Sequence, residues 1–236
     1  MLLKTIRNHA GSPGRGTLAR SRRDASSMRP YQRTLSTIAV ELKAHAPFTV
    51  FGAITGILVM GVLVMGAIPR SFSVTLFWGL HPFHVLLSAL VTAGMYRRHG
   101  GAGLVATTAI GYFGAIGIAT LSDCLIPYLG ETLLTLPNKG IHLGFIERWW
   151  LDNPMAVVGI AIAYVKPTTQ FPHAAHVLLS TWASLFHMTM AFGEEIGLLT
   201  LVTIPIFLFL AVWIPCCTSD IVFPLLFSPR NGRQQR

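Results

Sequence analysis

Charged residues are scarce in this sequence. They make up 11% of its 236 residues, whereas an ordinary soluble domain carries about 25%. Hydrophobic residues make up 52% of the chain, which is more apolar surface than a soluble core of this size needs. The composition therefore excludes an ordinary soluble domain and predicts that the surplus apolar surface faces lipid.

Acidic residues are the rarer charge, with nine Asp and Glu against 18 Lys and Arg. An excess of this kind can indicate nucleic-acid binding, but half of the basic residues precede residue 46 and the others occupy short gaps between apolar runs. That distribution is typical of membrane topology rather than of a phosphate-binding groove. We therefore expect the lipid bilayer as a partner, and no nucleic acid.

Several catalytic and binding motifs are also missing. The chain has no Walker A motif, so the sequence offers no ATPase site of that type. It also has neither the G-x-S-x-G nucleophile elbow of hydrolases nor the H-E-x-x-H helix of zinc proteases. Its three cysteines, Cys124, Cys216 and Cys217, contain no C-x-x-C pair, so they do not form a zinc-ribbon pattern. We expect them to be free buried thiols.

What the sequence does contain is a series of apolar runs, and most of them reach the ~20 residues that cross a bilayer. They span Pro47–Ile68, Phe72–Tyr96, Gly103–Leu129, Met155–Val165, Pro172–Phe192 and Leu198–Phe227. The fourth run is short unless it recruits Trp149 and Trp150. The sequence thus predicts an all-α integral membrane protein of about six transmembrane helices, with interruptions near Pro82, Pro127 and Pro215.

The charges of the loops predict the orientation of these helices. An even number of spans places both ends of the chain on one side, together with Arg97, Arg98 and Lys166. That side collects 15 of the 18 basic residues, and the other side holds only Arg70, Lys139 and Arg148. Because cytoplasmic loops carry the positive excess, we expect both termini in the cytoplasm of a plasma (inner) membrane.

One sequence pattern occurs twice. The motif His-x-x-His-Val-Leu-Leu-Ser lies at residues 81–88 and again at 173–180. A Pro and a Gly five residues apart open each half, at 47 and 154, and Ser-Asp followed by Pro closes each half, at 122–127 and 219–224. These ordered matches predict a duplicated three-helix unit. Because the unit has an odd number of helices, its copies are expected to form two pseudo-symmetric, inverted repeats, as in many secondary transporters.

The chain is therefore divided into five parts. Residues 1–46 have the composition of a disordered basic cytoplasmic tail, with a mitochondrial-type presequence as the alternative. Residues 47–131 form the first three-helix repeat and residues 154–229 the second. The connector at 132–153 is expected to be an amphipathic interfacial segment, or alternatively a cation-collecting vestibule with Glu131, Glu147 and Asp152. A basic tail, 230–236, ends the chain.

The candidate site consists of ionisable residues within the spans, which are costly in lipid and commonly functional. Helical spacing places the histidines of each repeat on one helix face, and one Asp closes each repeat. The predicted metal ligands are His81, His84, His173, His176, Asp123, Asp220 and His187. Imidazole with carboxylate suits Zn, Fe, Mn, Ni or Cu, and the sequence does not choose among them. A proton relay through the same residues is the alternative chemistry.

The pattern favours a membrane transporter or permease for a divalent transition-metal cation, with a His/Asp site between the two repeats. The alternative is a membrane-embedded metalloenzyme with a mononuclear or dinuclear His/Asp site. A scaffold protein would not explain why both repeats carry polar stripes. The sequence leaves the oligomeric state open, a homo-oligomer included.

Overall fold

The described part of the chain is helical throughout. The computed structural model describes residues 69–167, 170–193, 197–217 and 222–228, with scattered positions between residues 43 and 66. Within these ranges there is no strand, so the all-α prediction is confirmed for them. The elements are α3 (Arg70–Arg98), α4 (Leu104–Thr120), the π-helix η1 (Leu121–Leu125), α5 (Ile126–Leu133), α6 (Gly144–Glu147), α7 (Trp149–Val165), α8 (Gln170–Met190), α9 (Leu198–Cys217) and α10 (Phe223–Phe227).

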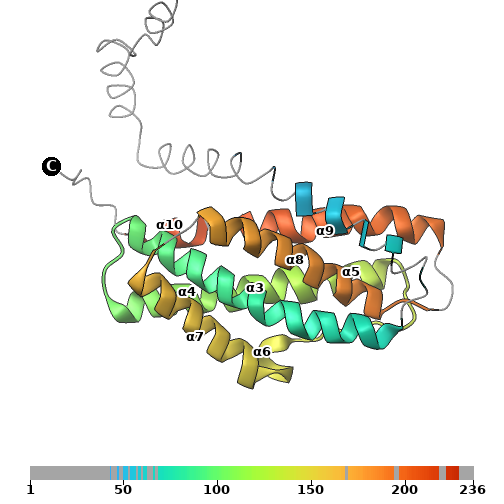
Figure 1. The fold of residues 1–236 in the computed structure, drawn as a ribbon, viewed down its shortest axis with the longest axis horizontal. Helices are drawn as coiled ribbons and strands as arrows, with labels where there is room; N and C mark the ends of the chain where they lie inside the picture. The colour runs from blue at the N-terminus through green and yellow to red at the C-terminus, as the bar shows by residue number, and fades with distance from the viewer. Residues whose placement is uncertain are drawn as a thin grey trace, which may run out of the picture. The chain divides into compact units, whose positions relative to one another are not determined.

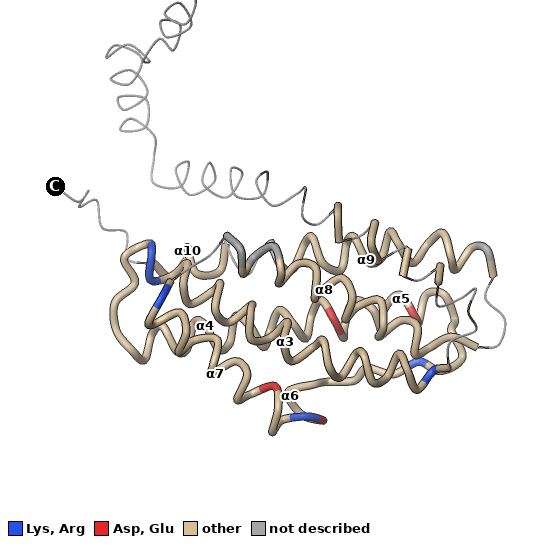
Figure 2. The backbone as a smooth tube through the Cα atoms, viewed as in Figure 1, with Lys and Arg blue, Asp and Glu red and all other residues tan. Residues whose placement is uncertain are grey.

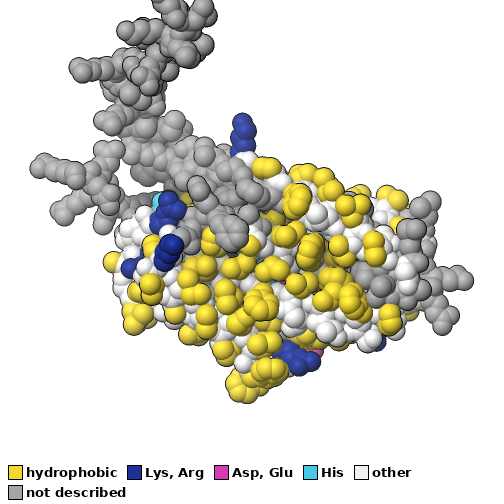
Figure 3. All heavy atoms as spheres, viewed as in Figure 1, with side chains coloured by type: hydrophobic (Ala, Val, Ile, Leu, Met, Phe, Trp, Pro, Cys, Tyr) yellow, Lys and Arg dark blue, Asp and Glu magenta, His cyan; other side chains and the backbone are white. Residues whose placement is uncertain are grey.

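Among the described residues, three helices are long and apolar enough to cross a membrane: α3, the continuous α4–η1–α5 rod from Leu104 to Leu133, and Leu199–Cys216 within α9. α7 is a shorter apolar helix of 17 residues. Many large apolar side chains lie on the outside, including Val105 at 83% exposure and Val165 at 89%, and Figure 3 shows how sparse the charged side chains are on one face. The prediction of a membrane protein is supported to this extent.

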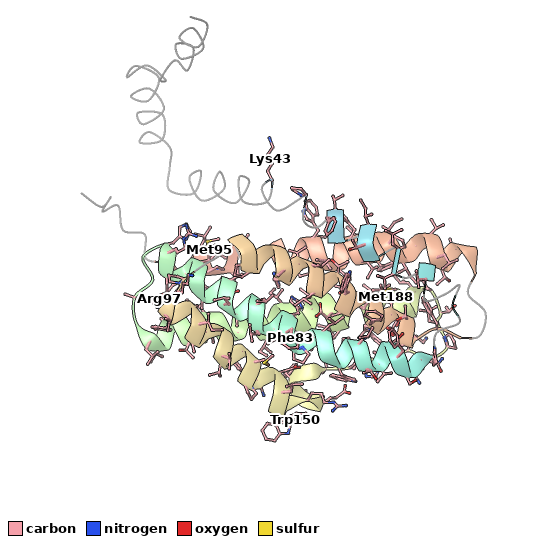
Figure 4. All side chains as sticks on the ribbon, viewed as in Figure 1. Lys43, Phe83, Met95, Arg97, Trp150 and Met188 are labelled. Atoms are coloured by element: carbon pink, nitrogen blue, oxygen red, sulfur yellow. The ribbon has the colours of Figure 1, made fainter. Side chains whose placement is uncertain are left out.

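The fourth apolar run does recruit the tryptophan pair. α7 begins at Trp149, whereas the predicted apolar run begins at Met155. The helix therefore includes both tryptophans. Trp150 points away from the bundle at this end of the helix (Figure 4), as expected of an aromatic anchor at a membrane interface. The connector is correspondingly shorter than predicted, with α6 as its only helix.

The prolines affect the helices less than we expected. α3 runs unbroken for 29 residues with Pro82 inside it, and α9 continues through Pro205 and Pro215. In the third run the distortion does occur: the π-helix η1 separates α4 from α5, and Pro127 stands in the first turn of α5. Because Pro127 has no N–H, it cannot donate to a carbonyl of the preceding turn, and the wide turn of η1 lies at this point.

The hydrogen bonds of two arginines show how α3, α7 and α8 run relative to one another. Arg70, at the start of α3, donates from Nε to the carbonyl of Met190 at the end of α8, at 2.7 Å. Arg97, near the end of α3, donates to the carbonyl of Tyr164 at the end of α7, at 2.6 Å. α3 is therefore antiparallel to α8 and parallel to α7, as the ribbon also shows (Figure 1).

Small residues allow α7 to approach α3 closely. The core between α3, α4 and α7 is rich in alanine, with Ala89, Ala115 and Ala156 fully buried. A methyl group placed on Gly159 of α7 would overlap the main-chain carbonyl of Leu86 in α3. Close packing of this kind through small side chains is typical of helices in lipid.

Several sequence predictions fall outside the described residues. They include most of the amino-terminal tail, the last residues of the chain, and the Ser219–Asp220 pair. In the first predicted span, the described residues between Phe51 and Val62 are helical.

Candidate metal centre

A set of ionisable side chains lies buried between the helices. Figure 2 shows basic residues near the two ends of the bundle and beside α6, and acidic residues within the length of the bundle and at α6. The members exposed by no more than 1% are His81, His84, Asp123, Glu131, Asp152, His176 and His187. Burial of so many ionisable groups is costly unless they are paired or bind an ion.

Asp123 lies at the centre of this set. Four side chains donate to it at 3.0 Å or less, and the Ser184 hydroxyl is a fifth, longer neighbour at 3.4 Å from Oδ1. Oδ2 of Asp123 is 2.9 Å from Nδ1 of His81 and 2.5 Å from Nδ1 of His84. Its Oδ1 accepts from Ser122 at 2.7 Å and from Ser180 at 3.0 Å. Because a carboxylate offers about four lone-pair positions, these four donors leave Asp123 fully hydrogen-bonded.

The π-helix η1 places Asp123 in this position. Its wide turn is marked by the Ile126 N–H, which bonds to the carbonyl of Leu121 five residues earlier. The next carbonyl, that of Ser122, would by the same pattern accept from residue 127, which is a proline and has no N–H. Ser184 of α8 replaces that donor, with its Oγ 2.9 Å from the Ser122 carbonyl.

His84 takes part in two groups whose atoms could hold a metal ion. In one group it lies with His81 and Asp123, and in the other with His176 and Cys216; within each group, one ligand atom per residue lies within 4.8 Å of the others. The rings of His84 and His176 have centroids 4.5 Å apart. Three helices thus contribute to the second group: α3, α8 and α9.

His81 faces a second carboxylate on its other side. Its Nε2 lies 3.4 Å from Oδ2 of Asp152 in α7, and neither carboxylate oxygen of Asp152 has a hydrogen-bond partner. Gly144 of α6 packs against both residues, since a methyl group at this position would overlap Asp152 and His81. Asp152 is therefore a buried carboxylate with no donor on either oxygen.

His187 forms a separate pair with Glu131, one level further along α8. Its Nδ1 is 2.7 Å from Oε1 of Glu131, whose Oε2 accepts from the Gly140 N–H at 3.1 Å. The remaining nitrogen, Nε2 of His187, is buried without a hydrogen-bond partner.

Aromatic rings connect this pair with the central group. Phe77 stacks on His81 with ring centroids 5.4 Å apart and contacts His187 edge-on at 5.1 Å. The ring of His142, whose side chain is 28% exposed, lies 5.4 Å from that of His187. The rings of His142, His187, Phe77 and His81 are therefore in successive contact, from a partly exposed loop residue to the buried centre.

The structure thus brings together four of the predicted ligands, His81, His84, Asp123 and His176, and it places His187 apart from them. His173 lies in the first turns of α8, where the side chains are not described, and Asp220 lies outside the described residues. The expectation of buried thiols is confirmed for Cys124 and Cys216.

Glu131 and Asp152, which the sequence suggested for an outer vestibule, are instead buried inside the bundle. Helical periodicity explains Asp152, because Ala156, Ile160 and Ala163 follow at helical spacing on the same buried face of α7.

Sequence reasoning missed Cys216 as a potential ligand. The signal was available: Ile204, Leu208 and Val212 precede it at intervals of four residues, and all are fully buried. A residue that continues such a stripe faces the interior of the bundle.

Comparison of the chain with protein-family models, with curated proteins and with solved structures found no match. The function must therefore be argued from the chemistry of this centre.

Proposed function

We propose that this protein is a membrane transporter for a divalent transition-metal ion, which binds at the buried centre between two oppositely oriented halves. The observation that carries the proposal is the group of His84, His176 and Cys216, whose possible ligand atoms lie within 4.8 Å of one another, next to the buried His81 and Asp123. Imidazole with thiolate and carboxylate is a donor set for zinc and neighbouring transition metals rather than for magnesium or calcium.

The origin of the ligands supports a site between the halves. His81, His84 and Asp123 come from the first predicted repeat, and His176 and Cys216 come from the second. α3 and α8, which carry the duplicated histidine motif, run in opposite directions, as inverted repeats require. Sites between inverted repeats are typical of secondary transporters.

The row of rings from His142 to His81 supports a route for the ion from the partly exposed loop before α6. His142 is partly exposed on the loop before α6, and His187 and Phe77 lie between it and His81. His142 has a φ of 40°, a conformation that is uncommon for residues other than glycine. Backbone strain of this kind clusters at functional sites.

Ion flux into proteoliposomes tests the proposal. We expect His84→Ala and His176→Ala each to lower zinc or manganese flux by at least tenfold, because each removes a ligand of the centre. The matched control is His99→Ala, since His99 lies at the end of α3, away from the centre, and bonds to its own helix through Met95. Unchanged flux in both of the centre variants would overturn the proposal.

The second candidate is a membrane metalloenzyme with a resident metal. It is favoured by the hydrogen bonds around Asp123, because ligands oriented in this way bind a metal tightly, whereas transport requires release. Metal content after washing with a chelator separates the two functions. An ion that stays bound in stoichiometric amount indicates an enzyme, and an ion that is readily lost indicates transport.

A further inference from the structure

Asp123 determines which nitrogen of each neighbouring histidine can bind a metal. An ionised carboxylate only accepts hydrogen bonds, so Nδ1 of His81 and Nδ1 of His84 must both carry the proton. In each neutral ring the lone pair is then on Nε2. Metal-binding histidines commonly have this arrangement, with one nitrogen donating to a carboxylate and the other binding the ion.

The two Nε2 atoms belong to different surroundings. Nε2 of His84 is buried without a hydrogen-bond partner, and His84 shares a possible ligand group with His176 and Cys216. Nε2 of His81 instead faces Asp152. The histidines lie with ring centroids 6.5 Å apart, on either side of the Asp123 carboxylate.

The distance between His81 and Asp152 fits an ion between them. At 3.4 Å, Nε2 and Oδ2 are beyond the usual range of a hydrogen bond, about 2.7–3.2 Å. Two ligands that are each about 2.1 Å from a tetrahedral ion are separated by about 3.4 Å. Both oxygens of Asp152 lack a hydrogen-bond partner while fully buried, so the carboxylate has lone pairs available for a cation.

We propose that the centre holds two divalent transition-metal ions, one bound by His84, His176 and Cys216 and the other by His81 and Asp152. Asp123 lies between them as a positioning residue that binds neither ion, because its four lone-pair positions are occupied by Ser122, Ser180 and the two histidines. This inference rests on the proposed function for the class of ion, and it adds the number of ions and their separate ligands.

Cobalt binding to the purified full-length protein in detergent tests this arrangement. We expect two Co²⁺ per native chain and a thiolate-to-cobalt charge-transfer band. Cys216→Ser should lose that band and one ion, with Cys124→Ser, a buried cysteine outside the ligand groups, as the control that keeps both. Asp152→Asn should lose the other ion and retain the band. Gly144→Ala, which crowds His81 and Asp152 without removing a ligand, should behave like Asp152→Asn.

Asp123→Asn tests the positioning role. We expect a 10- to 100-fold weaker affinity for cobalt, with a visible spectrum at saturation that matches the native one, because no ligand of either ion has changed. A changed spectrum at saturation would identify Asp123 as a ligand and overturn that role.

The outcomes distinguish this inference from the transport proposal. One ion per native chain, or the loss of the same ion in Cys216→Ser and Asp152→Asn, would overturn the two-ion centre even if metal flux is present. Two ions without any flux would support the two-ion centre and overturn transport.

Discussion

At the scale of single residues, the buried carboxylates differ in how their charge is compensated. Asp123 has four donors, and Glu131 has two, the imidazole of His187 and the N–H of Gly140. Asp152 has none within hydrogen-bond geometry. Its one close ionic partner is Nε2 of His81, at 3.4 Å. Because a weakly compensated buried charge is costly, this difference marks Asp123 and Glu131 as components of the fold and Asp152 as the carboxylate with lone pairs left for a cation.

The role of Glu131 leads to a prediction about stability. Glu131→Ala leaves the His187 imidazole and the Gly140 N–H without a partner in the interior. We expect the free energy of unfolding to fall by about 3 kcal/mol or more, measured as a lower midpoint of thermal unfolding in detergent.

The matched control for that prediction is Glu147→Ala. Glu147 also faces a histidine, His142 at 3.6 Å, but its side chain is 45% exposed, and exposed pairs contribute only about 0–1 kcal/mol. Equal destabilisation by the two substitutions would contradict the distinction between the buried and the exposed pair.

Most of the central residues could be predicted from the sequence because helical spacing determines which side chains share a face. The His-x-x-His motifs identified His84 and His176, which lie side by side. Cys216 and Asp152 were not predicted as ligands. Their role depends on which helices are neighbours, and the spacing along one helix carries no information about its neighbours.

At the scale of helices, the close approach of α7 to α3 requires glycine at position 159. A side chain at Gly159 would meet the carbonyl of Leu86, and a main-chain atom inside a helix cannot move aside. The sequence predicted a span here, but not this contact, since a glycine in an apolar run is compatible with many packings.

We therefore predict that Gly159→Ala separates α7 from α3 and lowers the midpoint of thermal unfolding. Because Asp152 is carried by α7, cobalt binding should weaken as well. Gly117→Ala in α4 is the control: a methyl group there meets no atom within 4 Å, and replacing a helical glycine by alanine should stabilise by about 0.5–1 kcal/mol. A Gly159→Ala protein as stable as the native one would contradict the close approach.

The π-helix could not have been predicted from composition or periodicity. Its residues, Leu121–Leu125, read as the continuation of an apolar helix. What distinguishes them is a main-chain hydrogen bond that spans five residues instead of four, from Ile126 to Leu121. Ser184 of α8 then donates to the Ser122 carbonyl, although the two residues are 62 positions apart in the sequence. Pro127 was a partial signal, because we expected an interruption near it.

At the scale of the molecule, α3 and α7 run in one direction and α8 in the other. Arg97 and the end of α7 lie at one end of the bundle, and Arg70 and the end of α8 lie at the other. The three-plus-three arrangement itself remains a prediction, because part of the first span and the close of the second repeat lie outside the described residues.

Cysteine labelling in sealed vesicles tests the orientation. We expect Lys166→Cys, at the end of α7, and Lys139→Cys, near the end of α8, to react with a membrane-impermeant thiol reagent from opposite sides. Lys166 should be on the cytoplasmic side, because the basic excess lies there. The native chain, with buried Cys124 and Cys216, gives the background. Labelling of both variants from one side would contradict the predicted topology.

The two serine hydroxyls that α8 offers to η1 have a mechanical consequence. Ser180 donates to the Asp123 carboxylate and Ser184 to the Ser122 carbonyl, so sliding α8 along the rod would break both hydrogen bonds at once. Asp123 would lose one of its donors, and the Ser122 carbonyl would be left unsatisfied. Each buried acceptor left in that state costs about 1–3 kcal/mol. Relative movement of the two helices thus requires replacement donors, and water admitted to the centre is the simplest source. Opening of the bundle and wetting of its interior should therefore occur as one event.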